Sequence, residues 1–234
     1  MHKDERDYLQ EFTQLMDGFS TEHSREKVFN DFLNYAMCLY SKENSVSSEE
    51  EPPYMQPLKP YGKMGLQVFP ELLAMAQLQA LDNPRADLLG DYYLSSVDPS
   101  EGAIWADRLQ RSVNGLKPQQ GRAVLDPACG SGLVLLDIAS RTRENQFYGA
   151  DSREVCAKMA TLNLCLRGLS GEVAWMRAGT AEWFTSWRIN TDGKGIEPIS
   201  LVESDVCFWC MPPPVGELDR MVAGVDYPDK LMVL

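Results

Sequence analysis

The chain has 234 residues, of which 44% are hydrophobic, and a formal net charge of −12 at pH 7. This length and apolar content are sufficient for a folded core in one large domain, or in a domain with a helical extension. No apolar run approaches the roughly eighteen residues that cross a bilayer, and the N-terminus lacks a signal-peptide core. We therefore expect a soluble, cytoplasmic protein without a membrane partner.

The acidity is spread over the chain and bears on DNA binding. Residues 1–60 carry 12 acidic and 6 basic side chains, and residues 122–234 carry 15 and 11. Neither part has the basic stripe that is typical of a protein that grips duplex DNA alone. The acidic run at residues 41–53 predicts a solvated loop, with a partner-binding or DNA-mimicking loop as the alternative. We expect contact with DNA only through a partner.

Helical periodicity dominates the first 115 residues. Residues 7–19 and 28–40 each place apolar side chains at the spacing of one helix face. Residues 69–81 predict a third helix that starts at Pro70. Residues 86–97 and 101–116 predict two further helical segments, so we expect an all-helical region over residues 1–115.

From residue 116 onward, apolar strands alternate with helical segments, which is the pattern of a parallel sheet with crossover helices. The predicted strands are residues 123–126, 146–151, 172–176, 205–210 and 230–234, with a helix at 216–222 before the last. Residues 185–204 are turn-rich and are predicted to be irregular. The expected fold class is α/β, a Rossmann-like sheet of about five parallel strands in the order 3-2-1-4-5 over residues 116–234. A short apolar strand at its edge predicts cover by a partner chain or a second copy.

The six cysteines are irregularly spaced and predict reduced, mostly buried thiols. Cys207 and Cys210 form one local pair, but no second pair completes a zinc site. We therefore predict no metal site.

The segment Ala123–Ala139, AVLDPACGSGLVLLDIA, is the centre of the predicted sheet. It predicts a buried strand, a tight glycine turn and a helix. Gly130 and Gly132 let the backbone turn sharply and approach a ligand closely. The start of the helix supplies unpaired N–H groups, which suit a carboxylate or a phosphate. The spacing lacks the third glycine of a dinucleotide site and the lysine of a P-loop.

This glycine turn resembles the DPACGSG signature of DNA adenine amino-methyltransferases, especially the modification subunits of type I restriction systems. The matching residues are Asp126, Pro127, Ala128, Cys129, Gly130, Ser131 and Gly132. The F-P-x-L-L and D-x-L-G-x-x-Y motifs of that family are also matched, at residues 69–73 and 87–93. The resemblance implies a methyltransferase sheet whose glycine loop binds S-adenosylmethionine. It also implies that the family's usual sixth and seventh strands have no residues left here.

Other cofactor contacts are predicted at the ends of the next two strands. Asp151 lies 25 residues after Asp126, close to the ~20-residue offset of ribose-binding acids in dinucleotide sites. The resemblance gives Asp151 the cofactor ribose, while a helix cap is the other interpretation and is compatible with it. The family often has an acidic residue for adenine where this chain has Gly179 and Thr180. Residues 95–102 replace the family's aromatic segment near the methionine end of the cofactor, which weakens the expected affinity.

The catalytic motif departs further from the family. There the fourth strand ends in N/D-P-P-Y/F, in which the first side chain and a proline carbonyl accept hydrogen bonds from the target amine and the aromatic ring stacks on the flipped base. This chain has Met211, Pro212, Pro213 and Pro214 at these positions. A thioether is only a weak acceptor, and a proline ring offers a smaller face for stacking.

The resemblance therefore implies a methyltransferase-like pseudoenzyme with a cofactor-type pocket and a regulatory or structural role. One alternative is an active adenine methyltransferase that requires a partner subunit, with an acceptor from elsewhere and Trp209 or a partner residue stacking the base. A second alternative, from a different class, is an acidic anti-restriction protein that mimics DNA.

Overall fold

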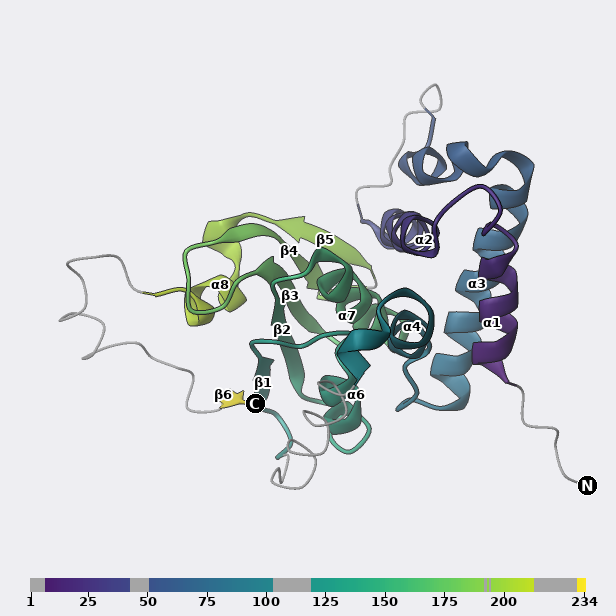
Figure 1. The fold of residues 1–234 in the computed structure, drawn as a ribbon. Helices are drawn as coiled ribbons and strands as arrows, with labels where there is room; N and C mark the ends of the chain where they lie inside the picture. Colours follow the sequence, from purple (N-terminus) through teal and green to yellow (C-terminus); the bar gives the residue numbers. More distant parts are fainter. Residues whose placement is uncertain (1–6, 43–50, 103–118, 192, 194, 213–230) are drawn as a thin grey trace, which may run out of the picture.

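The computed structural model describes residues 7–42, 51–102, 119–191, 193, 195–212 and 231–234. Figure 1 shows a group of helices from the first part of the chain packed beside a sheet with its own helices. The predicted helix at 216–222, almost all of the one at 101–116 and most of the acidic loop at 41–53 lie outside the described residues.

The helical region is described over residues 7–42 and 51–102. Its α-helices are α1 (Tyr8–Asp17), α2 (Arg25–Tyr40), α3 (Gly62–Asp82) and α4 (Leu88–Tyr92). Side chains cap the first two, because Asp7 accepts from the Gln10 amide at 3.0 Å and Ser24 from the Lys27 amide at 3.2 Å. A π-helical segment, Tyr93–Val97, continues α4. The predicted helices at 7–19, 28–40 and 86–97 are thus confirmed.

The start of the third helix was predicted wrongly. Helix α3 begins at Gly62, directly after a 3₁₀ helix over Pro53–Tyr61, and Pro70 lies inside it. An internal proline costs a helix about 3 kcal/mol. Packing beside it offsets that cost, since Phe69 is fully buried and its ring lies 5.2 Å from that of Tyr61 and 5.7 Å from that of Phe19.

The described residues form one six-stranded sheet in the order β5-β4-β3-β2-β1-β6. Strands β6, β1, β2 and β3 are mutually parallel, whereas β4 and β5 are antiparallel to their neighbours. The strands are β1 (Ala123–Asp126), β2 (Gln146–Asp151), β3 (Gly171–Met176), β4 (Trp183–Ile189), β5 (Ile196–Ile199) and β6 (Leu231–Val233). The α/β class, the helical N-terminal region and four of the predicted strands are confirmed.

The prediction of an irregular segment over residues 185–204 was wrong. Most of it belongs to the β4–β5 hairpin, in which the Ile189 and Ile196 side chains are buried. Asn190 adopts φ 51° at the turn and its side-chain amide donates to the Leu169 carbonyl at 3.0 Å. Gly193 and Gly195 also have positive φ, which glycine adopts without steric strain.

The predicted fourth strand, residues 205–210, is instead the helix α8 (Asp205–Cys210). Ser204 caps this helix by accepting from the Cys207 amide at 3.1 Å. The predicted order 3-2-1-4-5 is therefore wrong as well. The place beside β1 is taken by β6, with Ala123 paired to Leu231 and Leu125 to Val233.

One hydrophobic core runs through both regions. Helices α6 (Leu133–Ala139) and α7 (Glu154–Leu166) pack on the same side of the sheet as the N-terminal helices, while α8 covers the other side. The main cluster includes Phe12 of α1, Phe69 of α3 and Phe147 of β2. This shared cluster packs the N-terminal helices against the sheet and its helices. The predicted domain boundary near residue 115 lies outside the described residues.

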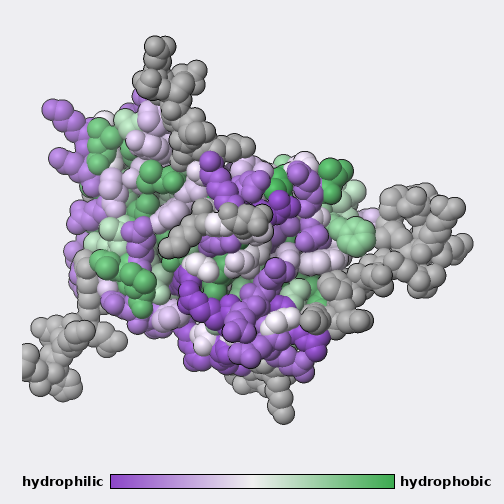
Figure 2. All heavy atoms as spheres, turned by 180° about the vertical axis from the view of Figure 1, so that it is seen from behind, coloured by the Kyte–Doolittle hydropathy of each residue, from purple (hydrophilic) through white to green (hydrophobic). Residues whose placement is uncertain are grey.

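The surface is mostly polar. Figure 2 shows hydrophilic residues over much of the rear face, densest at its lower end, with hydrophobic residues in scattered groups. Within the part of the chain that the structure describes, no helix is both long and apolar enough to cross a membrane.

Candidate functional site

The glycine turn follows β1 as the sequence predicts. Asp126 ends the strand, and its Oδ1 accepts from the Ala128 amide at 3.0 Å. The turn is closed by the Gly132 amide, which donates to the Cys129 carbonyl at 2.8 Å. Gly130 and Gly132 have φ 56° and 86°, where a side chain would strain the backbone. The sharp turn therefore depends on these two glycines.

Asp151 ends β2 and is bonded directly to this turn. Its Oδ2 accepts from the Gly130 amide at 2.9 Å, and its Oδ1 accepts from the Arg153 amide at 2.9 Å. The residue is 6% exposed. A carboxylate has about four acceptor positions, so each oxygen retains capacity for a ligand hydroxyl. Asp151 thus orders the turn before α7 but does not cap this helix, whose N-cap residue is Arg153 and which has no side-chain cap. A ribose-binding role stays a prediction.

Gly179 and Thr180 lie in the loop between β3 and β4, at the same edge of the sheet. Gly179 has φ 77°, and its amide donates to the Cys210 carbonyl at 2.7 Å. The Thr180 hydroxyl donates to the Arg177 carbonyl at 2.7 Å and accepts from the Glu182 amide at 3.1 Å. These bonds attach the loop to the end of α8 and engage the Thr180 hydroxyl within the loop.

Met211 follows the last residue of α8, and its amide donates to the Cys207 carbonyl at 3.0 Å. Its side chain is partly buried against the apolar cluster that contains Leu125 and Tyr148. The structure thus brings Met211 and Pro212 to the same side of the molecule as the loop of Gly179. Pro213 and Pro214 lie outside the described residues.

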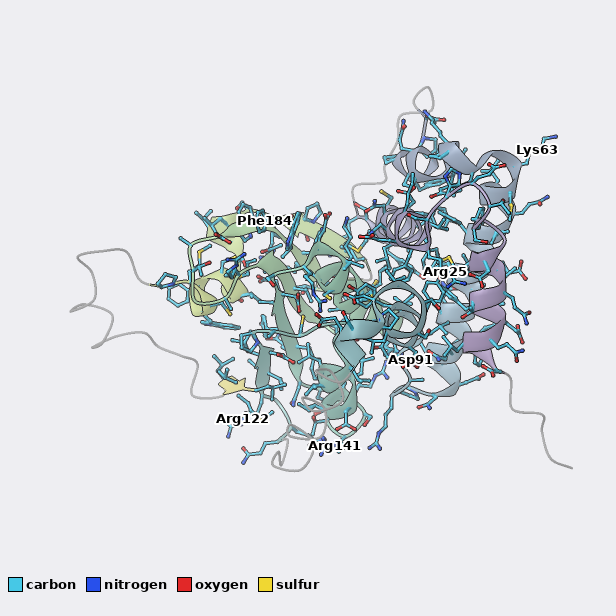
Figure 3. All side chains as sticks on the ribbon, in the orientation of Figure 1. Arg25, Lys63, Asp91, Arg122, Arg141 and Phe184 are labelled. Atoms are coloured by element: carbon cyan, nitrogen blue, oxygen red, sulfur yellow. The ribbon has the colours of Figure 1, made fainter. Side chains whose placement is uncertain are left out.

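Two aromatic pairs lie on the outer parts of this region. The Trp209 ring meets the ring of Tyr148 edge-on, with centroids 4.7 Å apart. Trp175, near the end of β3, stacks on Phe184 at 4.4 Å, and its indole N–H donates to the Ser152 carbonyl at 3.2 Å. Figure 3 shows Phe184 toward this end of the sheet, with Arg122 and Arg141 at the other.

Arg153 links the helical region to the start of α7. Its guanidinium lies 3.2 Å from a Glu101 carboxylate oxygen, 3.8 Å from one of Asp98 and 5.8 Å from the centre of the Tyr93 ring. Burial lowers the pKa of Arg153, but the nearby Cys156, Asp151, Tyr93 and Glu101 together raise it above its usual value. Sequence reasoning missed Arg153, whose only signal was its place two residues after Asp151.

A cleft of about 290 Å³ lies at the opposite end of the sheet. Residues 139–143 precede β2 and residues 167–169 precede β3, so the cleft adjoins the amino ends of these strands, away from Asp126 and Asp151. It is lined by Asn83, Pro84, Arg85, Ala139, Ser140, Arg143, Arg167 and Leu169.

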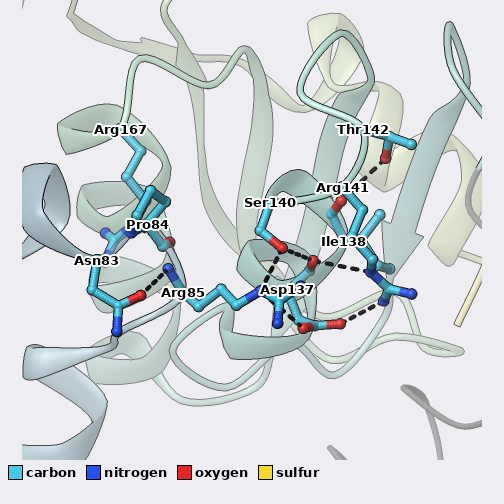
Figure 4. Close-up of polar contacts among 9 residues, drawn as sticks. All are labelled: Asn83, Pro84, Arg85, Asp137, Ile138, Ser140, Arg141, Thr142 and Arg167. Atoms are coloured by element: carbon cyan, nitrogen blue, oxygen red, sulfur yellow. Dashed lines mark hydrogen bonds and ion pairs between the residues drawn. The ribbon is translucent and has the colours of Figure 1, made fainter.

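The arginines of this cleft bond to the protein itself. Arg85 Nε donates to Ser140 Oγ at 2.7 Å, as Figure 4 shows, and Arg167 Nε donates to the Pro84 carbonyl at 3.0 Å. Arg143 donates to the Arg167 carbonyl just after α7. Basic side chains commonly satisfy carbonyls at helix ends in this way. The arginine side chains in this cleft are therefore accounted for by contacts that hold the fold together.

The cysteines offer neither a nucleophile nor a described metal site. No disulfide joins any of the six, which all lie in the described residues, and five are buried. Burial raises the pKa of Cys129 and Cys156, which keeps these thiols protonated and unreactive. Among the described residues, no group of three or more His, Cys, Asp or Glu side chains could hold a metal ion.

Comparisons with known proteins identify relatives of part of the chain. Residues 107–188 match the family model described as N-6 DNA Methylase. The type I restriction enzyme MjaVII methylase subunit of Methanocaldococcus jannaschii is 34% identical over 99 residues, which cover 37% of this chain and 17% of that protein. The chain therefore matches only a small part of the length of this curated relative.

A crystal structure described as a class I S-adenosylmethionine-dependent methyltransferase from Listeria monocytogenes aligns with 71% of this chain and 52% of its own. The sequence identity is 16% and the TM-score 0.30. A TM-score this low supports no argument about the fold or the function.

Proposed function

We propose that this chain, whose residues 107–188 match the N-6 DNA Methylase family, is a DNA N6-adenine methyltransferase-family protein. We propose that it binds S-adenosylmethionine at the carboxyl edge of its sheet without transferring the methyl group. The hydrogen bond from the Gly130 amide to Asp151 Oδ2 carries the cofactor part of this proposal. It joins the two elements that a cofactor of this kind would bridge, the turn after β1 and the acid at the end of β2. Ligands of open α/β sheets bind at this edge.

The residues present fit such a cofactor. The unused acceptor positions of Asp151 would receive the ribose hydroxyls, and the Gly130–Gly132 turn would let the rest of the ligand approach the backbone. When bound, the cofactor supplies an electrophilic methyl group. Adenine would lie toward Gly179, whose amide already donates to the Cys210 carbonyl. We therefore propose that the loop recognises this base by the shape of its backbone and offers it no side-chain acceptor.

At the position of the family's catalytic motif, the side chain of Met211 does not provide the acceptor that methyl transfer to an adenine amine needs. In the sequence, Met211 stands where the family has Asn or Asp, although it follows helix α8 and not a fourth strand. Its partly buried side chain packs among apolar side chains, and a thioether is only a weak acceptor. Pro214 stands where the family has the stacking aromatic residue. Loss of a positioned polar group of this kind typically costs about 10²- to 10³-fold in rate. We propose that Met211–Pro214 is a degenerate catalytic motif and that the chain is a pseudoenzyme.

A pseudoenzyme of this family would act as a regulatory or structural component. The curated relative is by name a subunit of a restriction enzyme, and we extend that setting to this chain. It would bind another protein chain or a second copy in the cytoplasm, and would reach DNA only through that partner. The net charge of −12 agrees with this, because a chain so acidic repels duplex DNA.

A second candidate is an active methyltransferase whose partner supplies the missing acceptor. The Gly130–Asp151 bond is equally compatible with this candidate, because both candidates bind the cofactor at the ordered turn. The two candidates share the cofactor and differ in whether methyl transfer to DNA occurs when a partner is present.

Calorimetric titration with S-adenosylmethionine tests the cofactor part. We expect micromolar binding by the unmodified protein and none by Asp151→Ala. Asp17→Ala is the matched control, since it removes a carboxylate that pairs with Arg25 on the surface, far from the site, and it should bind normally. Absence of binding by the unmodified protein at millimolar ligand would refute the proposal.

Labelled methyl transfer tests the catalytic part. The protein is incubated with DNA and labelled S-adenosylmethionine, with and without a type I modification subunit and its specificity subunit. We expect no labelled DNA that depends on this chain in either condition. Transfer that disappears in Asp151→Ala would establish the second candidate instead.

A further inference from the structure

Ser131, inside the glycine turn, is held by residues from outside the turn. Its hydroxyl donates to Asp87 Oδ2, and its carbonyl accepts from Asn163 Nδ2 at 2.9 Å. Ser131 is fully buried, so its hydroxyl faces the protein rather than a ligand. The turn is therefore fixed from behind by one residue that precedes α4 and one within α7.

Asp87 is the centre of these contacts. It is 3% exposed, and its Oδ1 accepts from the Gly90 amide at 2.9 Å and from Asn163 Nδ2 at 2.8 Å. With the Ser131 hydroxyl, three donors thus point at one carboxylate. Bonds to an ionised acceptor are about twice as strong as neutral ones, and a buried carboxylate with several donors stays satisfied.

Arg167 fixes the orientation of the amide that serves Asp87. Its Nη1 donates to Asn163 Oδ1 at 3.0 Å, so the Asn163 amide nitrogen has to face Asp87 and Ser131. Burial lowers the pKa of Arg167 to about 10, against the opposing effect of Asp87. The guanidinium thus stays charged at neutral pH and compensates the buried carboxylate.

Gly90 shows how closely these groups are packed. A Cβ on Gly90 would lie 2.2 Å from Asp87 Oδ2 and 2.7 Å from Ser131 Oγ. The D-x-L-G spacing of residues 87–90 therefore places a carboxylate and a residue without a side chain against the hydroxyl of the glycine turn. Leu89 between them is buried in the main core, which anchors the pair to the helical region.

We propose that Asp87 is a positioning residue for S-adenosylmethionine: it acts through Ser131 to hold the Gly130–Gly132 turn in the geometry that admits the cofactor. This inference rests on the proposed function. It gives the helical region a part in cofactor binding without any contact to the ligand. A misplacement of about 1 Å at such a site can cost about 10²-fold in function.

The test compares Asp87→Asn and Ser131→Ala, singly and together. Thr142→Val is the matched control, because it also removes one buried hydroxyl, which bonds to Ile138 and Asn145 at the far end of α6. Calorimetry should show affinity for S-adenosylmethionine lowered ~10- to 100-fold in each single variant. The double variant should lose no more affinity than the single variant with the larger loss, because one residue acts through the other. Thr142→Val should bind normally.

Amide hydrogen exchange is the second readout and does not depend on binding. Exchange at Gly130 and Gly132 should accelerate in Asp87→Asn and Ser131→Ala but not in Thr142→Val. Ser131→Ala keeps the test decisive should Asp87→Asn fail to fold. Unchanged affinity and exchange in Ser131→Ala would overturn the inference. If the unmodified protein does not bind the cofactor but amide exchange is accelerated in both variants, the proposed function is refuted. Asp87 would then be a residue that orders the turn without serving a cofactor.

Discussion

The carboxylate of Glu172, inside β3, accepts a hydrogen bond from the hydroxyl of Ser204, which in turn caps α8. Glu172 also accepts from the amides of Asp205 at 3.1 Å and Val206 at 3.2 Å. A strand residue therefore satisfies the first amides of a helix that follows it by more than thirty residues. These bonds fix α8 against the face of the sheet.

The burial of Glu172 gives a pH dependence with a defined sign. Burial raises the pKa of Glu172 above its usual 4.5, although the bonds from Ser204, Val206 and Asp205 oppose this. The folded state therefore binds more protons than the unfolded state between 4.5 and the raised pKa. The free energy of unfolding falls as pH rises through that window, by about 1.4 kcal/mol for each pH unit that the window spans.

Glu172→Gln should remove this dependence, because the amide does not titrate. Chemical denaturation of both proteins across this pH window would measure it. The stability of the unmodified protein relative to Glu172→Gln should fall as pH rises. A difference that is constant with pH would mean that burial does not perturb this carboxyl group.

The same contacts explain why residues 205–210 form a helix although the sequence predicts a strand. The sequence DVCFWC is short and apolar, and a short apolar run cannot be assigned to strand or helix from periodicity alone. The deciding contacts come from Glu172, which is remote in sequence and buried.

The β4–β5 hairpin was missed for a different reason. The sequence of residues 183–199 contains apolar residues that alternate with polar ones and an Asp-Gly pair between them. This pattern is a recognised hairpin signal, so the hairpin could have been predicted from the sequence.

The glycine turn was predictable because its signals are local. Strand, glycine turn and helix follow one another within Ala123–Ala139, and Asp151 ends the next strand. The support behind the turn was not predictable, since Asp87, Ser131 and Asn163 meet only in the folded chain. The D-x-L-G motif was recognised from the family, but its contact with Ser131 required the structure.

Gly90→Ala should destabilise the protein by about 2–3 kcal/mol. The new methyl group would overlap Asp87 Oδ2 and Ser131 Oγ, and neither can move without breaking a buried hydrogen bond. Gly102→Ala is the control, because Gly102 has φ −56° and a Cβ added there would meet no atom within 4 Å. That variant should be neutral or stabilised by up to about 1 kcal/mol. Urea denaturation of both measures the contrast, and equal stability would contradict the packing described for Gly90.

Arg153→Ala should loosen the segment 93–101 with little effect on global stability. The guanidinium is 33% exposed and binds Glu101 and Asp98, and such ion pairs contribute about 0–1 kcal/mol. The amide of Asp98, which donates to the Tyr93 carbonyl at 2.8 Å, should then exchange faster. In the unmodified protein, the exchange rate of the Asp98 amide should rise from low to high salt toward the rate in Arg153→Ala, because salt screens the ion pairs. Lys27→Ala, which breaks a surface pair with Asp31 on α2, should leave it unchanged.

The helical region and the sheet should unfold together, because one core joins them. Phe12 of α1 is fully buried and lies 5.1 Å from the ring of Tyr92, and Lys158 of α7 donates to Asn34 of α2 at 2.7 Å. Far-UV circular dichroism reports mainly the helices. Tryptophan fluorescence reports mainly the sheet and α8, where four of the five tryptophans lie, namely Trp175, Trp183, Trp187 and Trp209.

The two signals should give the same midpoint in urea. Phe12→Ala should lower both midpoints equally, with a loss of about 3–5 kcal/mol from a large cavity. A change in the circular dichroism midpoint alone would show that the two regions fold separately, and the helical region would then not be needed to hold the turn of Ser131.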